Sequence, residues 1–264
     1  VTAGRARVVC SVRDILVDAR RDQQHHDDRA RWLADRYFHA VIVHADASLA
    51  SLDESFRPTR NLRTPVYHSG YVVPARDPAE RAGLRRRDHL LVSAGGGIVG
   101  GPLFECMLEA HRHMPDPPPL RLVTGPFLPQ SAWNDLTART RTMHNVQLVR
   151  QVTDMVAEMR MARASISQCG YNTALDIAVS GVPALVVPYE APGENEQSNR
   201  AGRLADLRAV QMLPSSALQP QMLAAAIGKL WQFQPKALAI DLDGARRTRE
   251  IIERVCVDAG LEAW

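Results

Sequence analysis

The sequence predicts an α/β fold built around a doubly wound parallel sheet, accompanied by part of a second sheet. Short apolar runs alternate with longer amphipathic segments along most of the 264 residues, the pattern of parallel strands joined by helices. A glycine-rich stretch follows one buried run, and a stretch rich in Pro and charge separates two series of such runs. The hydrophobic fraction of 45% supports cores of this size without disulfides or metals.

The first series, residues 1–73, predicts only a thin sheet. Strands are expected at 7–10, 40–44 and 65–68, with a helix at 28–38. Because so few strands make a poor independent domain, and because the chain starts without Met almost directly at a strand, we expect it to lack an amino-terminal part of this domain. Residues 74–89 are the predicted linker, since Pro and charge replace periodic apolar residues there.

The second series, residues 90–235, predicts a complete sheet of about six parallel strands with helices between them. Strands are expected at 89–93, 121–124, 146–149, 164–167, 184–187 and 209–213. Helices are expected at 103–112, 131–141, 153–161, 173–180, 197–207 and 220–233. Residues 236–264 then form a C-terminal segment with a predicted helix at 241–256, where apolar residues recur at helical spacing.

Charge and cysteine usage exclude several classes of protein. Lys plus Arg exceed Asp plus Glu by only 32 to 29, and the charges are interspersed apart from residues 85–87, so a dedicated nucleic-acid surface is not indicated. The four cysteines lie far apart, which argues against a disulfide framework or a zinc site and favours a reducing cytoplasm. No apolar run approaches the roughly 18 residues that cross a bilayer.

The stretch SAGGGIVGG, residues 93–101, joins the first strand of the second series to its helix. At the carboxyl edge of a parallel sheet, such a turn lets backbone N–H groups and a helix N-terminus face a diphosphate. Gly95, Gly97 and Gly100 match the dinucleotide spacing, but the acid expected about 20 residues later is absent, which disfavours NAD. Pro102 likewise breaks the Walker pattern. A tight turn without a ligand is the alternative.

A second glycine turn lies in the stretch SQCGYNTALDIA, residues 167–178. Gly170 permits the turn, Asn172 or Thr173 is expected to cap the next helix, and Asp176 is expected in its first turn. The helix dipole alone would favour an acid there. Alternatively, Asp176 accepts hydrogen bonds from a neutral polyol such as a ribose, while the phosphates it would repel lie at the glycine turns.

A third candidate lies at the start of the helix that follows the run VPALVVPY. Glu196 and Gln197 offer a carboxylate and an amide, which bind hydroxyl groups in pairs and suit a sugar. An ordinary solvated helix N-terminus with an acid in its first turn is the alternative.

Three stretches together resemble the donor-binding domain of GT-B glycosyltransferases. In chain order they are the glycine loop, SQCGYNTALDIAVSGVPALVVPY and ENEQSNRA. The resemblance is strongest to the bacterial transferases that add N-acetylglucosamine to the lipid intermediate of peptidoglycan. It covers residues 90–230 well and extends more faintly to VVCSVRDILV and HSGYVVP, while SVRDIL resembles uncharacterised bacterial proteins of predicted glycosyltransferase function. It implies a Rossmann-like donor domain and part of a second Rossmann-like acceptor domain.

The resemblance also implies a donor-binding set. Its members are Gly95, Gly96 and Gly97 at the diphosphate, Ser167, Cys169 and Gly170 in the second turn, Asp176 at the ribose, and Glu196, Gln197 and Arg200 near the sugar. Asp176 stands where the family has Glu, Glu196 where it has Gln, and Arg200 where Asn is usual. The first two departures retain hydrogen-bonding function and leave the identity of the sugar open.

The implied reaction is an inverting, metal-independent transfer of a sugar, N-acetylglucosamine being one candidate, from a nucleotide diphosphate to an acceptor hydroxyl. UDP is the favoured nucleotide, no cofactor or metal is expected, and the acceptor, whether lipid-linked or a secondary metabolite, stays open. The base is expected in the acceptor domain outside this chain, with Arg13 and Asp14 as weaker candidates within it. A cytoplasmic location, peripheral at the inner membrane face, follows from the same resemblance.

Two other functions fit the same residues. One is a sugar-nucleotide hydrolase or epimerase, and the other is a donor-binding subunit that is active only with a partner chain. The histidines are given structural roles: His111 and His113 face different directions on a helix, and His44 and His68 close strands. Residues 25–28, His-His-Asp-Asp, are interpreted as a solvated run that precedes a helix.

Overall fold

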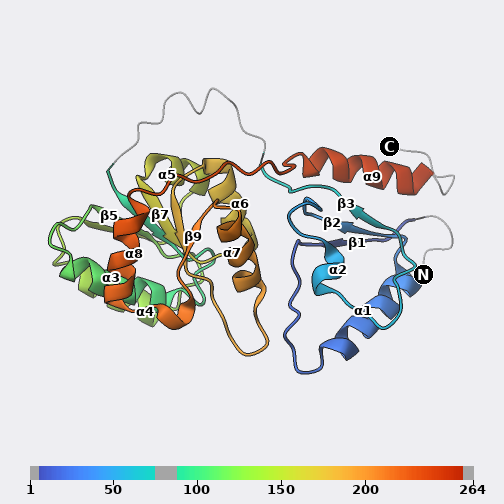
Figure 1. Cartoon of the computed structure of the whole chain (residues 1–264), viewed down its shortest axis with the longest axis horizontal. Helices are drawn as coiled ribbons and strands as arrows, with labels where there is room; N and C mark the ends of the chain where they lie inside the picture. The colour runs from blue at the N-terminus through green and yellow to red at the C-terminus, as the bar shows by residue number, and fades with distance from the viewer. Residues whose placement is uncertain (1–5, 75–87, 258–264) are drawn as a thin grey trace. The chain divides into compact units, whose positions relative to one another are not determined.

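The computed structural model describes residues 6–74 and 88–257 (Figure 1). The chain divides into two compact units. Unit 1 comprises Val1–Ala75, Ala191–Glu196 and Ala239–Trp264, and unit 2 comprises Arg76–Glu190 and Gln197–Leu238. Most of the predicted linker, 74–89, and the arginine run at 85–87 lie outside the described residues.

Unit 2 contains the doubly wound sheet that the sequence predicts. Its strands are β4 (Leu90–Ser93), β5 (Leu120–Val123), β6 (Val146–Val149), β7 (Ala164–Ser167), β8 (Ala184–Val186) and β9 (Gln211–Met212). They are parallel and form one six-stranded sheet in the order β6-β5-β4-β7-β8-β9. The helices are α3 (Gly101–His113), α4 (Gln130–Thr140), α5 (Met155–Met161), α6 (Tyr171–Ser180), α7 (Glu196–Asp206) and α8 (Pro220–Leu230).

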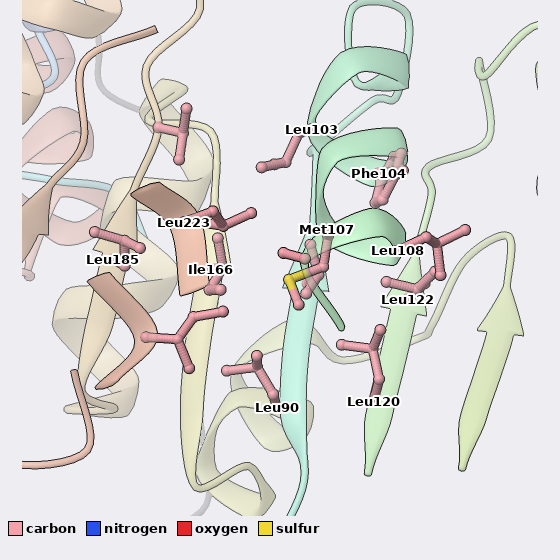
Figure 2. Packing of buried hydrophobic residues seen from close by; sticks show 14 of the residues in the cluster. Leu90, Leu103, Phe104, Met107, Leu108, Leu120, Leu122, Ile166, Leu185 and Leu223 are labelled. Carbon is pink, nitrogen blue, oxygen red and sulfur yellow. The ribbon is translucent and has the colours of Figure 1, made fainter. Parts of the chain in front are cut away.

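The central strands β4, β7 and β8 are buried along their whole length, which explains apolar runs such as LLV in β4 and ALV in β8. One face packs against α3 and α8, and Figure 2 shows side chains of this cluster at close range. The labelled residues are Leu90, Leu120, Leu122, Ile166 and Leu185 from the strands, Leu103, Phe104, Met107 and Leu108 from α3, and Leu223 from α8. This well-packed sheet gives the turns at its carboxyl edge a rigid base.

Unit 1 contains a three-stranded parallel sheet in the order β1-β2-β3. The strands are β1 (Val9–Val12), β2 (Ala40–Val43) and β3 (Val66–His68), and the helices are α1 (Gln23–Tyr37), α2 (Leu52–Ser55) and α9 (Gly244–Val257). Ile251 and Val255 of α9 pack against Ala40 and Ile42 of β2. The C-terminal helix therefore completes the core of unit 1, where Figure 1 shows it beside the sheet.

Helix α1 begins earlier than the sequence predicts, so residues 25–28 do not precede the helix, although His25 and His26 are exposed as interpreted. These residues lie within α1, and Asp27 is buried. Its carboxylate accepts hydrogen bonds from Nε2 of Gln23 at 2.8 Å and from the backbone N–H of Arg57 at 2.9 Å. These partners satisfy the acid inside the fold, and one of them is thirty positions away, so local hydropathy did not reveal the contact.

Asp35 in α1 clamps the segment that leads into β3. Its side chain is 3% exposed and accepts hydrogen bonds from the backbone N–H groups of Arg63 at 2.8 Å and Thr64 at 3.0 Å, besides an ion pair with Arg31 at 3.0 Å. Burial opposes ionisation, but the hydrogen bonds from Thr64 and Arg63 outweigh it and hold the pKa of Asp35 below its usual value. The ionised carboxylate therefore stabilises the folded state.

We expect Asp35→Asn to lower the free energy of unfolding of unit 1 by about 2 kcal/mol at pH 7, because hydrogen bonds to a charged acceptor are weakened. Since the folded pKa is lowered, this stabilisation is present above the unfolded pKa of about 3.9 and is lost as the pH falls through the folded pKa. Urea unfolding at pH 7 and in acid measures it, with Asp22→Asn on the solvent side as control. Equal stability of Asp35→Asn and wild type at pH 7 would contradict the clamp.

Candidate nucleotide-binding site

Two glycine-containing turns leave the sheet of unit 2 at its centre. Strands β4 and β7 are neighbours, and from them the strand order runs outward to β6 on one side and to β9 on the other. Ser93 and Ser167, the last residues of β4 and β7, are register partners, so the turns that follow start side by side. Ligands of open α/β sheets bind at this point, outside the carboxyl ends of the strands.

Part of the glycine content of the β4–α3 turn is required by the fold alone. Gly97 has a φ of 94°, and a Cβ there would lie 2.3 Å from the carbonyl oxygen of Thr124. Gly125, in the loop after β5, has a φ of 88°, and its Cβ would lie 2.4 Å from the carbonyl oxygen of Gly95. The two loops therefore pack backbone on backbone. Gly125 is not among the candidates predicted from the sequence, although a glycine directly after a predicted strand, in TGP, is a usable signal.

Other glycines have no such structural requirement. Gly170 is the N-cap of α6 with a φ of −64°, and a Cβ built on it meets no atom within 4 Å. Gly101, the first residue of α3, is equally open. Gly96 meets only the exposed ring of Phe127, at 3.3 Å. Because the first N–H groups of a helix lack partners within it, open space at the start of α3 and α6 suits an anion.

The β7–α6 turn is fixed by side chains that reach it from elsewhere in unit 2. Gln168 donates from Nε2 to the carbonyl oxygen of Val99 at 3.0 Å, which ties this turn to the β4–α3 turn. The Oε1 of Gln197 accepts from the N–H groups of Cys169 at 3.0 Å and Tyr189 at 3.1 Å. Both contacts use the oxygen of Gln197, so its Nε2 is the part of the amide that remains to donate to a ligand.

Arg200 also binds the β7–α6 turn. It is 4% exposed, its Nη1 donates to the carbonyl oxygen of Cys169 at 2.9 Å, and its guanidinium lies 6.0 Å from the ring of Tyr171 in the first turn of α6. The arginine that replaces the usual Asn therefore places a positive charge beside the turn. The side chains of Cys169 and Ser167 are fully buried, and the backbone N–H and carbonyl of Cys169 are already bound by Gln197 and Arg200.

Asp176 does not lie in the first turn of α6, where the sequence predicts it. Helix α6 begins at Tyr171 after the extended residue Gly170, neither Asn172 nor Thr173 caps it, and Asp176 falls in the second turn. The capping-box interpretation is therefore wrong. Because the helix dipole acts within the first turn, it no longer explains an acid at this position.

The remaining candidates belong to unit 1. Glu196 is grouped with it, although the next residue belongs to unit 2. Glu196 lines a cavity of about 380 Å³ whose other lining residues include Arg13, Arg20, polar side chains of α1 and apolar side chains. Asp14 is 2% exposed. The segment Ala191–Glu196 is anchored within unit 1, because Nδ2 of Asn195 donates a hydrogen bond of 2.6 Å to Oδ1 of Asp18.

A parallel sheet of this strand order, with glycine turns at its switch point, is typical of nucleotide-binding α/β domains. Residues 103–255 match the model of the Glycosyltransferase family 28 C-terminal domain, and the chain belongs to this family.

Two relatives show how far the similarity extends. The chain is 35% identical over 157 residues to the UDP-N-acetylglucosamine–N-acetylmuramyl-(pentapeptide) pyrophosphoryl-undecaprenol N-acetylglucosamine transferase of Mesorhizobium japonicum, covering 57% of this chain and 40% of the relative. It is 26% identical over 198 residues to an uncharacterised glycosyltransferase of Methanosarcina mazei, and this match covers 72% of this chain and 49% of the relative. The chain thus spans less than half of the length of these two relatives.

Solved structures share the fold. MurG of Acinetobacter baumannii superposes with a TM-score of 0.52 at 17% identity, covering 85% of this chain and 63% of that one. The glycosyltransferase VinC, in complex with dTDP, superposes with a TM-score of 0.54 at 16% identity, covering 83% of this chain and 52% of that one. The predicted GT-B fold class is confirmed. Within residues 6–74 and 88–257, no helix has the length and apolar character needed to span a bilayer.

Proposed function

We propose that unit 2 binds a nucleotide-diphosphate sugar and that the chain takes part in inverting, metal-independent transfer of the sugar to an acceptor hydroxyl. The observation that carries the proposal is the pair of helices, α3 and α6, that begin at open glycines beside the β4–β7 switch point. UDP is the favoured nucleotide, because the relative from Mesorhizobium japonicum is named for a UDP-sugar.

The proposal assigns most of the candidate residues to parts of the donor. The diphosphate lies at the turns of Gly95, Gly96, Gly97 and Gly170, where helix N-termini and the anchored charge of Arg200 stabilise it as it leaves. Asp176 accepts hydrogen bonds from the ribose hydroxyls. Nε2 of Gln197 and the carboxylate of Glu196 bind hydroxyls of the sugar.

The acceptor is proposed as a lipid-linked hydroxyl, by analogy with the undecaprenol-linked substrate in the name of the relative. A cytoplasmic location at the inner membrane face belongs to the same proposal. The second candidate function, a donor-binding subunit that needs a partner chain, uses the same residues of unit 2. Hydrolysis of the sugar nucleotide differs from transfer in needing only water.

A thermal-shift panel with UDP, dTDP, GDP, UDP-N-acetylglucosamine and NAD tests the proposal. A ligand at about 100 times its dissociation constant adds roughly 2.7 kcal/mol to the stability of the native state. We expect UDP and its sugar to stabilise the protein, NAD to have no effect, and Asp176→Ala to weaken UDP binding about tenfold through the lost ribose contacts, worth roughly 1.4 kcal/mol. Stabilisation by none of the nucleotides would refute donor binding. Product analysis with and without an acceptor then separates transfer from hydrolysis.

A further inference from the structure

A cavity of about 770 Å³ lies at the amino edge of the sheet of unit 2. Asp88 lies two residues before β4, Arg163 directly precedes β7 and Pro183 directly precedes β8, and all three line the cavity. Because the strands are parallel, the glycine turns lie at the opposite, carboxyl edge. The cavity is therefore separate from the candidate donor site, and its volume lies within the roughly 300–1,000 Å³ of small-molecule sites.

The end of α8 supplies the apolar part of this cavity. The sequence predicts a helix at 220–233, but α8 ends at Leu230, and the N–H of Phe233 donates to the carbonyl of Leu230 at 3.1 Å in the turn that follows. Leu230, Trp231 and Phe233 pack in the hydrophobic core cluster of unit 2 and also line the cavity. The core thus holds two aromatic residues at the cavity, where they offer an apolar surface.

Arg163 and Asp88 supply the charged part of the lining. The guanidinium of Arg163 lies 4.4 Å from the ring centroid of Trp231, and its Nη1 lies 3.6 Å from Oδ1 of Asp88. The backbone N–H of Arg163 donates to the carbonyl of His89 at 2.9 Å, so the strand ends fix the place of this residue. Because the acid and the base compensate each other, the described lining residues carry no net charge. The cavity therefore suits a neutral ligand better than an ion, which would bring an unpaired charge.

Two glutamines complete the lining. Gln232 and Gln234 are exposed and lie in the same short segment as the two aromatic residues. An amide both donates and accepts hydrogen bonds, so it can bind two neighbouring hydroxyl groups at once. Aromatic rings beside amides match the surface of a pyranose, whose C–H groups form an apolar face and whose hydroxyl groups point outward around the ring.

We propose that this cavity is a second ligand site of unit 2 and that it binds a neutral saccharide. The apolar face of a sugar ring lies on Trp231 and Phe233, while Gln232 and Gln234 bind its hydroxyl groups. Asp88 accepts a further hydrogen bond from a hydroxyl group. The site does not depend on the proposed donor binding, because the two sites share no residue and lie at opposite edges of the sheet.

Proton–nitrogen correlation NMR of the full chain tests the proposal, with maltotriose, triacetylchitotriose and sorbitol as probes. We expect both trisaccharides to shift the indole N–H signal of Trp231, which Trp231→Phe identifies, and to leave that of Trp133 in place. Trp133 is a matched reference, because the guanidinium of Arg150 lies 4.6 Å from its ring centroid. Sorbitol has hydroxyl groups but no ring, so an equal shift by sorbitol would contradict the binding of a sugar ring.

Variants of the exposed glutamines test the lining without disturbing the core. We expect the double variant Gln232→Ala/Gln234→Ala to bind the trisaccharides about tenfold more weakly through the lost hydrogen bonds, with an unchanged melting temperature. Gln221→Ala, at an exposed position in the first turn of α8, should bind them as the wild type does.

Three results would overturn the proposal. They are a Trp231 signal that neither trisaccharide shifts, full affinity in the double variant, and displacement of the trisaccharides by UDP-N-acetylglucosamine, which would place them in the candidate donor site. Unchanged trisaccharide affinity at saturating UDP-N-acetylglucosamine supports the second site. Failure of trisaccharide binding leaves the proposed donor binding standing, and failure of UDP binding leaves the second site standing.

Discussion

Replacement of Gly97 by alanine is expected to destabilise unit 2 by about 3 kcal/mol, since a side chain at left-handed φ and overpacking each cost on the order of 1–3 kcal/mol. The φ of 94° is unfavourable for any L side chain, and the new methyl group would lie 2.3 Å from a backbone oxygen that cannot move independently. Thermal and urea unfolding followed by circular dichroism measure the loss.

Gly101→Ala is the control for this prediction. It adds the same methyl group at the start of α3, where no atom lies within 4 Å, and its effect should stay within about 0.5 kcal/mol. If the two variants were equally stable, the tight backbone packing between the β4–α3 and β5–α4 loops would not be a property of the folded protein.

Gly170→Ala is expected to leave stability nearly unchanged but to weaken UDP binding about 100-fold, roughly 2.7 kcal/mol. The backbone at Gly170 suits any residue, and the space that a methyl group would fill is empty. In the proposed complex this space belongs to the diphosphate, so the methyl group and the phosphate oxygens exclude each other. Melting temperature and titration calorimetry together separate the effect on binding from the effect on folding. A variant that binds UDP as tightly as the wild type would show that the diphosphate does not approach Gly170.

The sheet of unit 2 was predictable from the sequence because its central strands, β4, β7 and β8, are buried along their whole length. Runs such as LLV and ALV carry no polar residue, and β6 and β7 have the predicted bounds of 146–149 and 164–167. The parallel order follows from the alternation with helices. The glycine turns were predictable for the same reason, since a glycine cluster after a buried strand marks a βα turn.

Features that depend on contacts distant in sequence were not predictable. The start of α1 depends on Asp27 finding a backbone N–H at Arg57. Sequence periodicity identified the final helix, but not that Ile251 and Val255 pack on β2 of unit 1. In each case the stabilising partner lies tens to hundreds of residues away.

The candidate donor site was likewise predictable only in part. Sequence resemblance selected Gln197 and Arg200 as residues near the sugar, but it could not show that both bind the backbone of Cys169. It also could not separate the glycines that the fold requires, such as Gly97, from those that leave open space, such as Gly170. That distinction needs coordinates, because it depends on which atoms of another loop approach the missing side chain.

The central claim is that unit 2 holds a diphosphate at the start of α6, and calorimetric titration of UDP and of uridine tests it most directly. The titrations use wild type, Gly170→Ala and Gly228→Ala, the last adding a methyl group in open space on α8. The account predicts that wild type and Gly228→Ala bind UDP far more tightly than uridine, and that Gly170→Ala loses this preference while retaining its melting temperature. Equal affinity of the wild type for UDP and uridine, or full UDP affinity in Gly170→Ala, would contradict it.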